Sequence, residues 1–167
     1  MDNGKKNTYV KTQMTAALLE LLEERELRDI SVSEIASAAG VHRVSFYRNY
    51  QEKEDILREY ILGLFGMWTA EYDRQPRHSD DDLCAHLFQH LYACRDFYAL
   101  LSRRGYLHML KDVLMSISGP KPEYPNIGAY TAAFITCGLY GWIEEWIARG
   151  KQESAAQMAA LLAQRNF

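Results

Sequence analysis

The stretch SVSEIASAAGVHRVSFYRNY, Ser31 to Tyr50, decides the fold expected for this chain. Ser31 followed three residues later by Glu34 forms a capping box, in which each side chain satisfies a backbone N–H group at a helix start. Gly40 stands where that helix should end, because glycine readily adopts the left-handed conformation found there. The next helix, about His42 to Tyr47, is too short to be stable without packing. The stretch therefore predicts a helix, a turn and a short second helix, which is a helix-turn-helix.

Size and composition place this motif in an ordinary globular protein. The chain has 167 residues, 48% of them hydrophobic and 25% charged, with a net charge of −3. No apolar run approaches the roughly 20 residues needed to span a bilayer, and no secretory signal is recognised at the N-terminus. We therefore expect a cytoplasmic protein without a membrane partner. Three cysteines without a CxxC motif favour reduced thiols over a disulfide framework.

Apolar residues recur at helical spacing along the rest of the chain, and no stretch alternates with period two. The fold class expected is all-α, with a three-helix head at residues 1–52 and a larger helical body for ligand binding and dimerisation at residues 53–167. Residues 1–7 are expected to form a flexible arm. Helices are expected at 8–24, 32–39, 42–47, 51–73, 81–94, 96–117, 127–148 and 154–164, with a break near Gly105.

The polar residues around the short helix have side chains that can contact DNA bases and phosphates. Arg43 can donate two hydrogen bonds to guanine, Val44 can contact a thymine methyl, and Ser45 can bond a base or a phosphate. Cationic and amide side chains nearby suit phosphate contacts, which position a protein without reading sequence. No acidic residue lies between Glu34 and Glu52, so this face is locally positive. The candidate phosphate contacts on these grounds are Tyr47, Arg48, Asn49 and Lys53, together with Lys5 and Lys6 near the N-terminus.

The stretch ISVSEIASAAGVHRVSFYRNYQEKEDIL, residues 30–57, resembles the DNA-binding head of TetR-family transcriptional regulators. The match to the family pattern extends over residues 8–62. The resemblance implies a dimer that binds a palindromic double-stranded operator, and most simply a repressor released by a small-molecule effector. It implies phosphate contacts from His42, Ser45, Tyr47, Asn49 and Lys53. It also implies base or groove contacts from Ser33, Arg43, Val44, Ser45 and Tyr47.

The segment GLYGWIEEWIARGKQESAAQMAALL, residues 138–162, resembles the end of one TetR-like C-terminal domain, whose last helices pack against a second copy. Each glycine within a helix costs about 1 kcal/mol relative to alanine, so close helix approach is a plausible compensation. Packing within one subunit is the alternative. The candidate dimer residues are Gly138, Gly141, Trp142, Glu145, Trp146, Met158 and Leu161.

Aromatic residues are frequent in the body, where some are expected to line a pocket for a hydrophobic or aromatic effector and others to fill the core. The candidates are Trp68, Tyr72, Phe88, Tyr92, Tyr106, Tyr130 and Phe134.

Two further interpretations stay open. A TetR-like coactivator would act through a protein partner without an operator of its own. A small metal-binding protein would use His86, His90 and Cys94, which recur every four residues along one helix face. No enzyme motif such as GxSxG, a P-loop or HExxH is present, so neither an enzyme nor a cofactor is expected.

Overall fold

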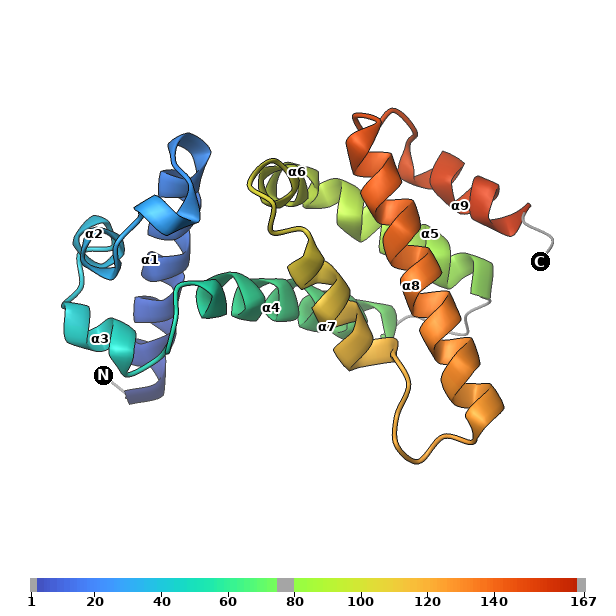
Figure 1. Ribbon diagram of the computed structural model, residues 1–167, viewed down its shortest axis with the longest axis horizontal. Coiled ribbons are helices and arrows are strands. Elements are labelled where there is room, and N and C mark those ends of the chain that lie inside the picture. The colour runs from blue at the N-terminus through green and yellow to red at the C-terminus, as the bar shows by residue number, and fades with distance from the viewer. Residues whose placement is uncertain (1–2, 75–79, 165–167) are drawn as a thin grey trace. The chain divides into compact units, whose positions relative to one another are not determined.

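The computed structural model describes residues 3–74 and 80–164, and every regular element in these ranges is helical (Figure 1). The absence of strands from these ranges confirms the all-α prediction. The elements are α1 (Asn3–Glu24), the 3-10 helix η1 (Leu27–Asp29), α2 (Val32–Ala38), α3 (Arg43–Tyr47), α4 (Glu54–Tyr72), α5 (Asp80–Ala93), α6 (Arg95–Arg103), α7 (His108–Ser118), α8 (Asn126–Ala148) and α9 (Ala155–Ala163).

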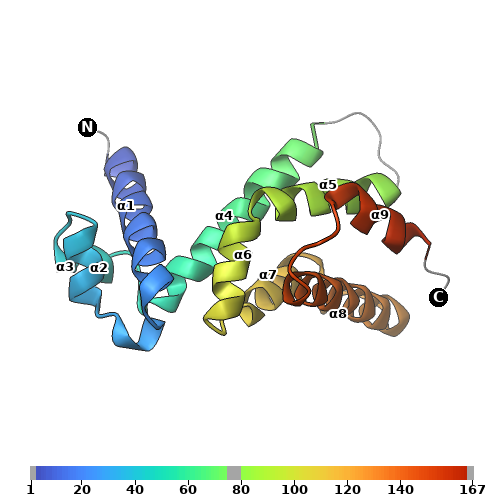
Figure 2. The same ribbon diagram turned by 90° about the horizontal axis from the view of Figure 1, so that it is seen from above.

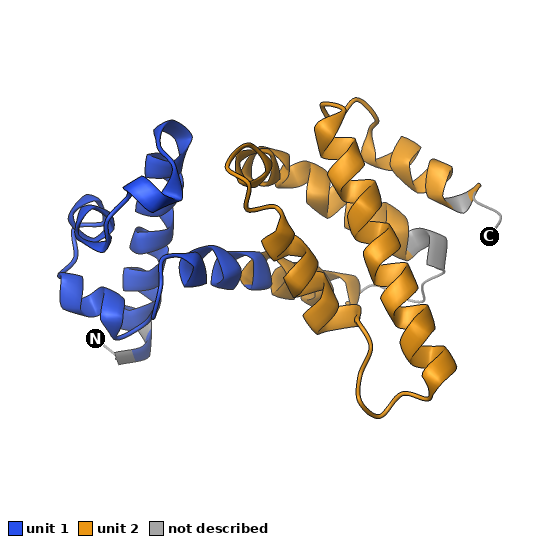
Figure 3. Cartoon of the chain, viewed as in Figure 1, with its two compact units in different colours: residues 1–62 blue, residues 63–167 orange. Residues whose placement is uncertain are grey.

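The chain divides into two compact units, residues 1–62 and residues 63–167 (Figure 3). The division falls inside α4, which continues across it, whereas the sequence suggested a division after residue 52. The first half of α4 completes the core of unit 1, with Ile56, Leu57 and Ile61 fully buried. A boundary drawn where the helix-turn-helix motif ends therefore leaves out part of that core.

Unit 1 is organised by the packing of α1, α2 and α3 and by a capped start of α2. The backbone N–H of Ser31 donates to Glu34 Oε2 at 2.8 Å, and the N–H of Glu34 donates to Ser31 Oγ at 3.2 Å. The guanidinium of Arg25 adds a hydrogen bond to Glu34 at 2.6 Å. The capping box predicted from the sequence is confirmed. The largest fully buried residues of this unit are Met14, Leu18, Leu22, Leu27, Ile30, Ile35, Phe46, Ile56 and Leu57.

In unit 2, α9 packs along α5, and α8 packs against α7 and α6 (Figures 1 and 2). Its fully buried aromatic residues include Phe65, Phe88 and Tyr98. Thr136 is a buried polar residue whose hydroxyl donates to the Ser118 carbonyl at 3.1 Å and so ties α8 to the end of α7. None of the described helices has the length and apolar character needed to cross a membrane.

The sequence prediction is wrong at the start of the chain, because α1 already begins at Asn3 where a flexible arm was expected. The hydroxyls of Thr8 and Thr12 donate to the carbonyls of Gly4 and Thr8, one turn earlier in the helix. Apolar periodicity reveals only the part of a helix that packs on a core, so a polar extension of the same helix escapes it. Residues 1–2 lie outside the described ranges.

The predicted break near Gly105 is confirmed. Gly105 has φ +76° and separates α6 from α7, and Gly40 has φ +63° after α2. Both values lie in the left-handed region, where a side chain is strained and glycine is not.

Candidate nucleic-acid interface

Helix α3 has one buried side and one exposed side. Phe46 is fully buried, and its ring centroid lies 5.3 Å from that of Tyr47 and 5.6 Å from that of Tyr50. On the other side Val44 is 60% exposed and Tyr47 is 54% exposed, and Arg43 is exposed as well. Because a helix of five residues is not stable alone, the packing of Phe46 is what presents these three side chains at the surface.

The turn before α3 is held by the backbone. The N–H of Val41 donates to the carbonyl of Ala36 at 2.9 Å, directly after Gly40 in its left-handed conformation. His42 precedes α3 with an exposed imidazole that makes no capping hydrogen bond to the described helix. Ser33, in the first turn of α2, is exposed too. Both remain available to a ligand at this surface.

Arg43 and Tyr47 contact each other one helical turn apart. Arg43 Nη2 donates to the Tyr47 hydroxyl at 2.9 Å, and the guanidinium carbon lies 5.4 Å from the centroid of the Tyr47 ring. The hydrogen bond and the cation–π contact together hold the arginine along the exposed side of α3.

A groove of about 490 Å³ lies between the start of α1 and the end of α3. It brings together three predicted phosphate contacts, Lys6, Arg48 and Asn49, although more than 40 residues separate the first from the others. The Asn49 amide donates to the Ser45 carbonyl at 2.8 Å, which fixes its orientation. Sequence reasoning missed the groove residues contributed by α1, which are Gly4, Asn7 and Val10. Extending the helical register of α1 towards the N-terminus would have pointed to them. The side chain of Lys5 lies outside what the structure describes.

Lys53 was also predicted to contact phosphate, but its ammonium group has partners within unit 1. It donates to the carbonyl oxygens of Leu27 at 2.5 Å and Ile30 at 2.6 Å. Lys53, which immediately precedes α4, thereby contacts both ends of η1.

The acidic residue nearest in sequence before α3 is neutralised locally. The hydrogen bond from Arg25 and then those from Ser31 lower the pKa of Glu34 from 4.5 to about 2. Its carboxylate charge is therefore paired with Arg25 rather than left to oppose the cations of α3 and the groove.

The sequence family described as "Bacterial regulatory proteins, tetR family" matches residues 15–60 of this chain. A curated relative, the uncharacterized HTH-type transcriptional regulator YxbF of Bacillus subtilis (strain 168), is 25% identical over 175 residues, covering 93% of this chain and 45% of the relative. The chain thus spans less than half the length of that relative. A TetR transcriptional regulator from Streptococcus agalactiae 2603V has the same fold, with a TM-score of 0.63, 19% identity and 97% coverage of both chains. Residues 15–60 therefore carry the N-terminal domain of the tetR family of bacterial regulatory proteins.

Unit 2 does not gather the seven candidate effector aromatics into one cluster. Trp68 and Tyr72 are stacked, with centroids 6.0 Å apart. Phe88 is fully buried and packs edge-on against Trp146. The ring centroid of Tyr92 lies 6.3 Å from that of the same tryptophan. Three others lie elsewhere: Tyr106 is beside His108, while Tyr130 and Phe134 are 69% and 64% exposed on α8.

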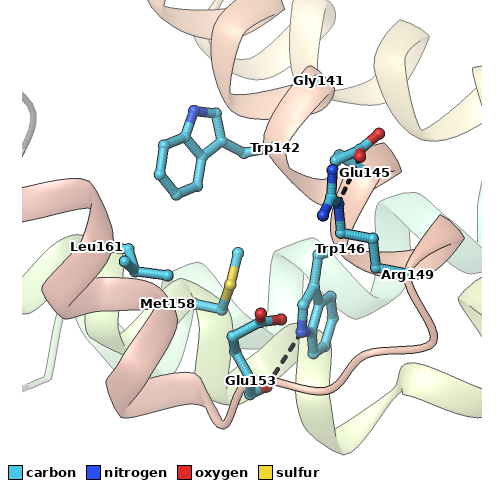
Figure 4. A pocket seen from close by; sticks show the side chains of 8 residues that line it. All are labelled: Gly141, Trp142, Glu145, Trp146, Arg149, Glu153, Met158 and Leu161. Carbon is cyan, nitrogen blue, oxygen red and sulfur yellow. Dashed lines mark hydrogen bonds and ion pairs between the residues drawn. The ribbon is translucent and has the colours of Figure 1, made fainter.

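The candidate dimer residues, by contrast, line one hollow, with the exception of Gly138. A hollow of about 450 Å³ lies between α8 and α9 (Figure 4), with Trp142 on the α8 side and Leu161 on the α9 side. Trp146 is buried beneath it and donates from Nε1 to the Glu153 carbonyl at 3.1 Å. Gly138 lies one turn before Gly141 on α8 and is exposed. The lining residues are Gly141, Trp142, Glu145, Trp146, Arg149, Glu153, Met158 and Leu161.

The proposed metal ligands His86, His90 and Cys94 do not form a site. Within the described ranges no group of three or more histidine, cysteine, aspartate or glutamate side chains is arranged to hold a metal ion. Burial raises the pKa of the Cys94 thiol, which disfavours the thiolate that a metal would need. Both histidine rings instead lie against Trp68 of α4, with centroids 6.2 Å away.

Proposed function

We propose that this chain is a homodimeric, sequence-specific DNA-binding regulator of the TetR family, and that it is a repressor released from its operator by a small-molecule effector. The observation that carries this proposal is α3, a short helix anchored by buried Phe46 that exposes Arg43, Val44 and Tyr47. We place the protein in the cytoplasm, where its DNA would be found.

Each side chain has a distinct part in the proposed complex. Arg43 donates to guanine, and Val44 contacts a thymine methyl group. Lys6 and Arg48, across the groove between α1 and α3, bind backbone phosphates and set the register. Ser33 and His42 are exposed at the edge of the same surface and contact the flanking backbone.

Selection of bound DNA from a random pool tests the proposal. A two-fold protein selects a palindrome whose half-sites lie one helical turn, about 34–36 Å, or a multiple apart. Arg43→Ala should cost about 1–3 kcal/mol at one base pair per half-site, while Arg48→Ala should weaken binding to all sequences alike. Equal affinity of the unmutated protein for the selected DNA and for random DNA would refute sequence-specific binding. It would favour instead a coactivator that acts through a protein partner.

The proposed dimer forms through α8 and α9. Gly138 and Gly141 have open space around them, since an added Cβ at either would meet no atom within 4 Å. The single chain therefore gives no steric reason for glycine, whereas close approach of a second α8 would. The exposed Ile127, Tyr130 and Phe134 continue the same side of α8 towards its start at helical spacing. Tyr130 and Phe134 are thus better assigned to this surface than to an effector pocket.

The proposed effector site lies beside Trp68 in unit 2. Trp68 Nε1 and His90 Nε2 are buried and have no hydrogen-bond partner among the described residues. A buried polar group without a partner costs about 1–3 kcal/mol, which a ligand with a hydrogen-bond acceptor would offset. Burial, reinforced by His86, lowers the pKa of His90, and Glu71 lies close enough to oppose that shift. A neutral imidazole beside a carboxylate disfavours an anion, so we propose an uncharged aromatic effector carrying a carbonyl or hydroxyl oxygen.

Acetophenone and ethylbenzene form a matched pair of probes, since they differ mainly in the acceptor oxygen. Acetophenone should shift the Trp68 indole N–H resonance, which a Trp68→Phe variant assigns, and ethylbenzene should shift it less. Equal shifts from both probes, or no shift from acetophenone up to its solubility limit, would contradict this site.

A further inference from the structure

Arg43 and Tyr47 form the one pair of side chains on the exposed side of α3 for which the described structure gives a direct polar contact. Arg43 Nη2 donates to the Tyr47 hydroxyl at 2.9 Å, and the guanidinium lies over the Tyr47 ring at 5.4 Å. Neither side chain is buried. Since surface side chains pack too little to be held by their surroundings, these two contacts are what limits the freedom of Arg43.

The neighbouring arginine provides a contrast. Arg48 follows α3, is exposed and lines the groove with Lys6. Its backbone N–H donates to the Val44 carbonyl, but its guanidinium makes no hydrogen bond or ion pair within the described part of the chain. A phosphate contact tolerates such freedom, because many arginine conformations reach a phosphate. A bidentate contact to a base edge does not, because it needs the guanidinium plane in one orientation.

The donor and acceptor inventory allows both residues to act at once. A phenol hydroxyl accepts and donates, and the Tyr47 oxygen already accepts from Arg43, so its proton remains for a phosphate oxygen. The guanidinium has five N–H donors and uses one of them on Tyr47. Enough donors remain for a two-bond contact to guanine.

We propose that Tyr47 is a positioning residue for Arg43: its hydroxyl bonds a DNA phosphate and the arginine together, so that the backbone contact orients the base contact. This inference rests on the DNA binding proposed above. It assigns the base-pair preference of this protein to the pair of residues and not to Arg43 alone.

A double-mutant cycle tests this coupling. The variants are Tyr47→Phe, which keeps the ring but removes the hydroxyl, Arg43→Ala, and both together. Binding is measured by fluorescence anisotropy to the selected operator and to an operator altered at the base pair most sensitive to Arg43→Ala. The ratio of the two affinities reports base discrimination, which loss of a phosphate contact alone does not change. Tyr124→Phe, an exposed tyrosine of unit 2, is the matched control.

Tyr47→Phe should reduce the discrimination ratio by about fivefold to tenfold, since an unheld arginine must be ordered on binding. In the Arg43→Ala background, Tyr47→Phe should leave the discrimination ratio unchanged. If Tyr47→Phe weakens both operators equally and does so in either background, Tyr47 contacts phosphate independently and the inference fails. The cycle starts from an operator that the selection experiment has already identified. If the protein does not bind specific DNA, the selection fails first, so that outcome is distinguished from a loss of coupling between Tyr47 and Arg43.

Discussion

The ammonium group of Lys53 lies 2.6 Å from the carbonyl oxygen of Ile30, and it donates a second hydrogen bond to the carbonyl of Leu27. Ile30 ends the turn that leads into α2, and Lys53 immediately precedes α4. The lysine thus joins two segments of unit 1 that lie more than 20 residues apart in sequence. A residue that family resemblance assigns to DNA has a structural partner in the protein itself.

Replacing Lys53 with methionine should therefore destabilise unit 1. The change keeps the aliphatic stem but removes two charge-assisted hydrogen bonds, with an expected loss of about 1 kcal/mol because the site is partly exposed to water. Amide hydrogen exchange of the η1–α2 segment is the measurement, and Lys6→Met, at an exposed position, is the control. If Lys53→Met leaves exchange unchanged but lowers the salt slope of DNA binding by about one, Lys53 acts on phosphate after all.

The ionised Glu34 should make the stability of unit 1 depend on pH in the acid range. Hydrogen bonds from Arg25 and then from Ser31 lower its folded pKa from 4.5 to about 2. A lowered carboxyl pKa contributes stability that is fully present above the unfolded value and is lost as the pH falls through the folded value. Denaturation of the wild type and of Glu34→Gln, followed between pH 6 and about pH 2, should therefore converge as the pH falls.

Glu20→Gln is the matched control for this titration, because Glu20 is an exposed glutamate of the same unit. The free energy of unfolding of Glu20→Gln should follow that of the wild type over the same pH range. A constant difference between wild type and Glu34→Gln over the whole range would show that the Arg25 contact does not depend on the charge of Glu34.

Phe46 and Val44 lie on opposite sides of α3 and should separate stability from recognition. Phe46→Leu should destabilise unit 1 by about 1–2 kcal/mol, since it removes buried aromatic packing, and it should weaken binding to every DNA sequence because α3 loses its anchor. Val44→Ala, at a position 60% exposed, should change stability by less than about 0.5 kcal/mol.

Thermal unfolding and operator affinity, measured on both variants, check this prediction. Val44→Ala should weaken only operators that present a thymine methyl group at its position. A general loss of affinity in Val44→Ala with no change in Phe46→Leu would show that the two sides of α3 are wrongly assigned, with Val44 anchoring the helix and Phe46 facing the DNA.

Gly141→Arg should prevent dimerisation while leaving the single chain folded. An added side chain at Gly141 meets no atom within 4 Å in one chain, but it would stand in the path of a second α8. Gly66→Arg is the matched control, because Gly66 is also an exposed helical glycine with open space around it. Sedimentation velocity of both variants should give monomers for Gly141→Arg and dimers for Gly66→Arg. Dimers of unchanged affinity in both would place the interface elsewhere.

The sequence was most informative where a single local interaction determines the structure. The capping box of Ser31 and Glu34 and the left-handed glycines 40 and 105 involve neighbours along the chain, so their residue types predict them. The exposure of the candidate DNA contacts Arg43, Val44 and Tyr47 follows for the same reason, since buried Phe46 takes the other side of one short helix. The prediction failed at the start of α1, where a polar helical turn has no apolar signature.

What the sequence determined by itself is the motif at Ser31–Tyr50, the all-α class and the residue types that face outward from α3. These follow from propensities and spacings that act over a few residues. The tertiary structure alone decided that Lys53 bonds the carbonyls of Leu27 and Ile30, that Lys6 shares a groove with Arg48, and that Trp68 meets His86 and His90. These contacts join segments distant in sequence, and their geometry depends on how whole helices pack, which no local pattern contains.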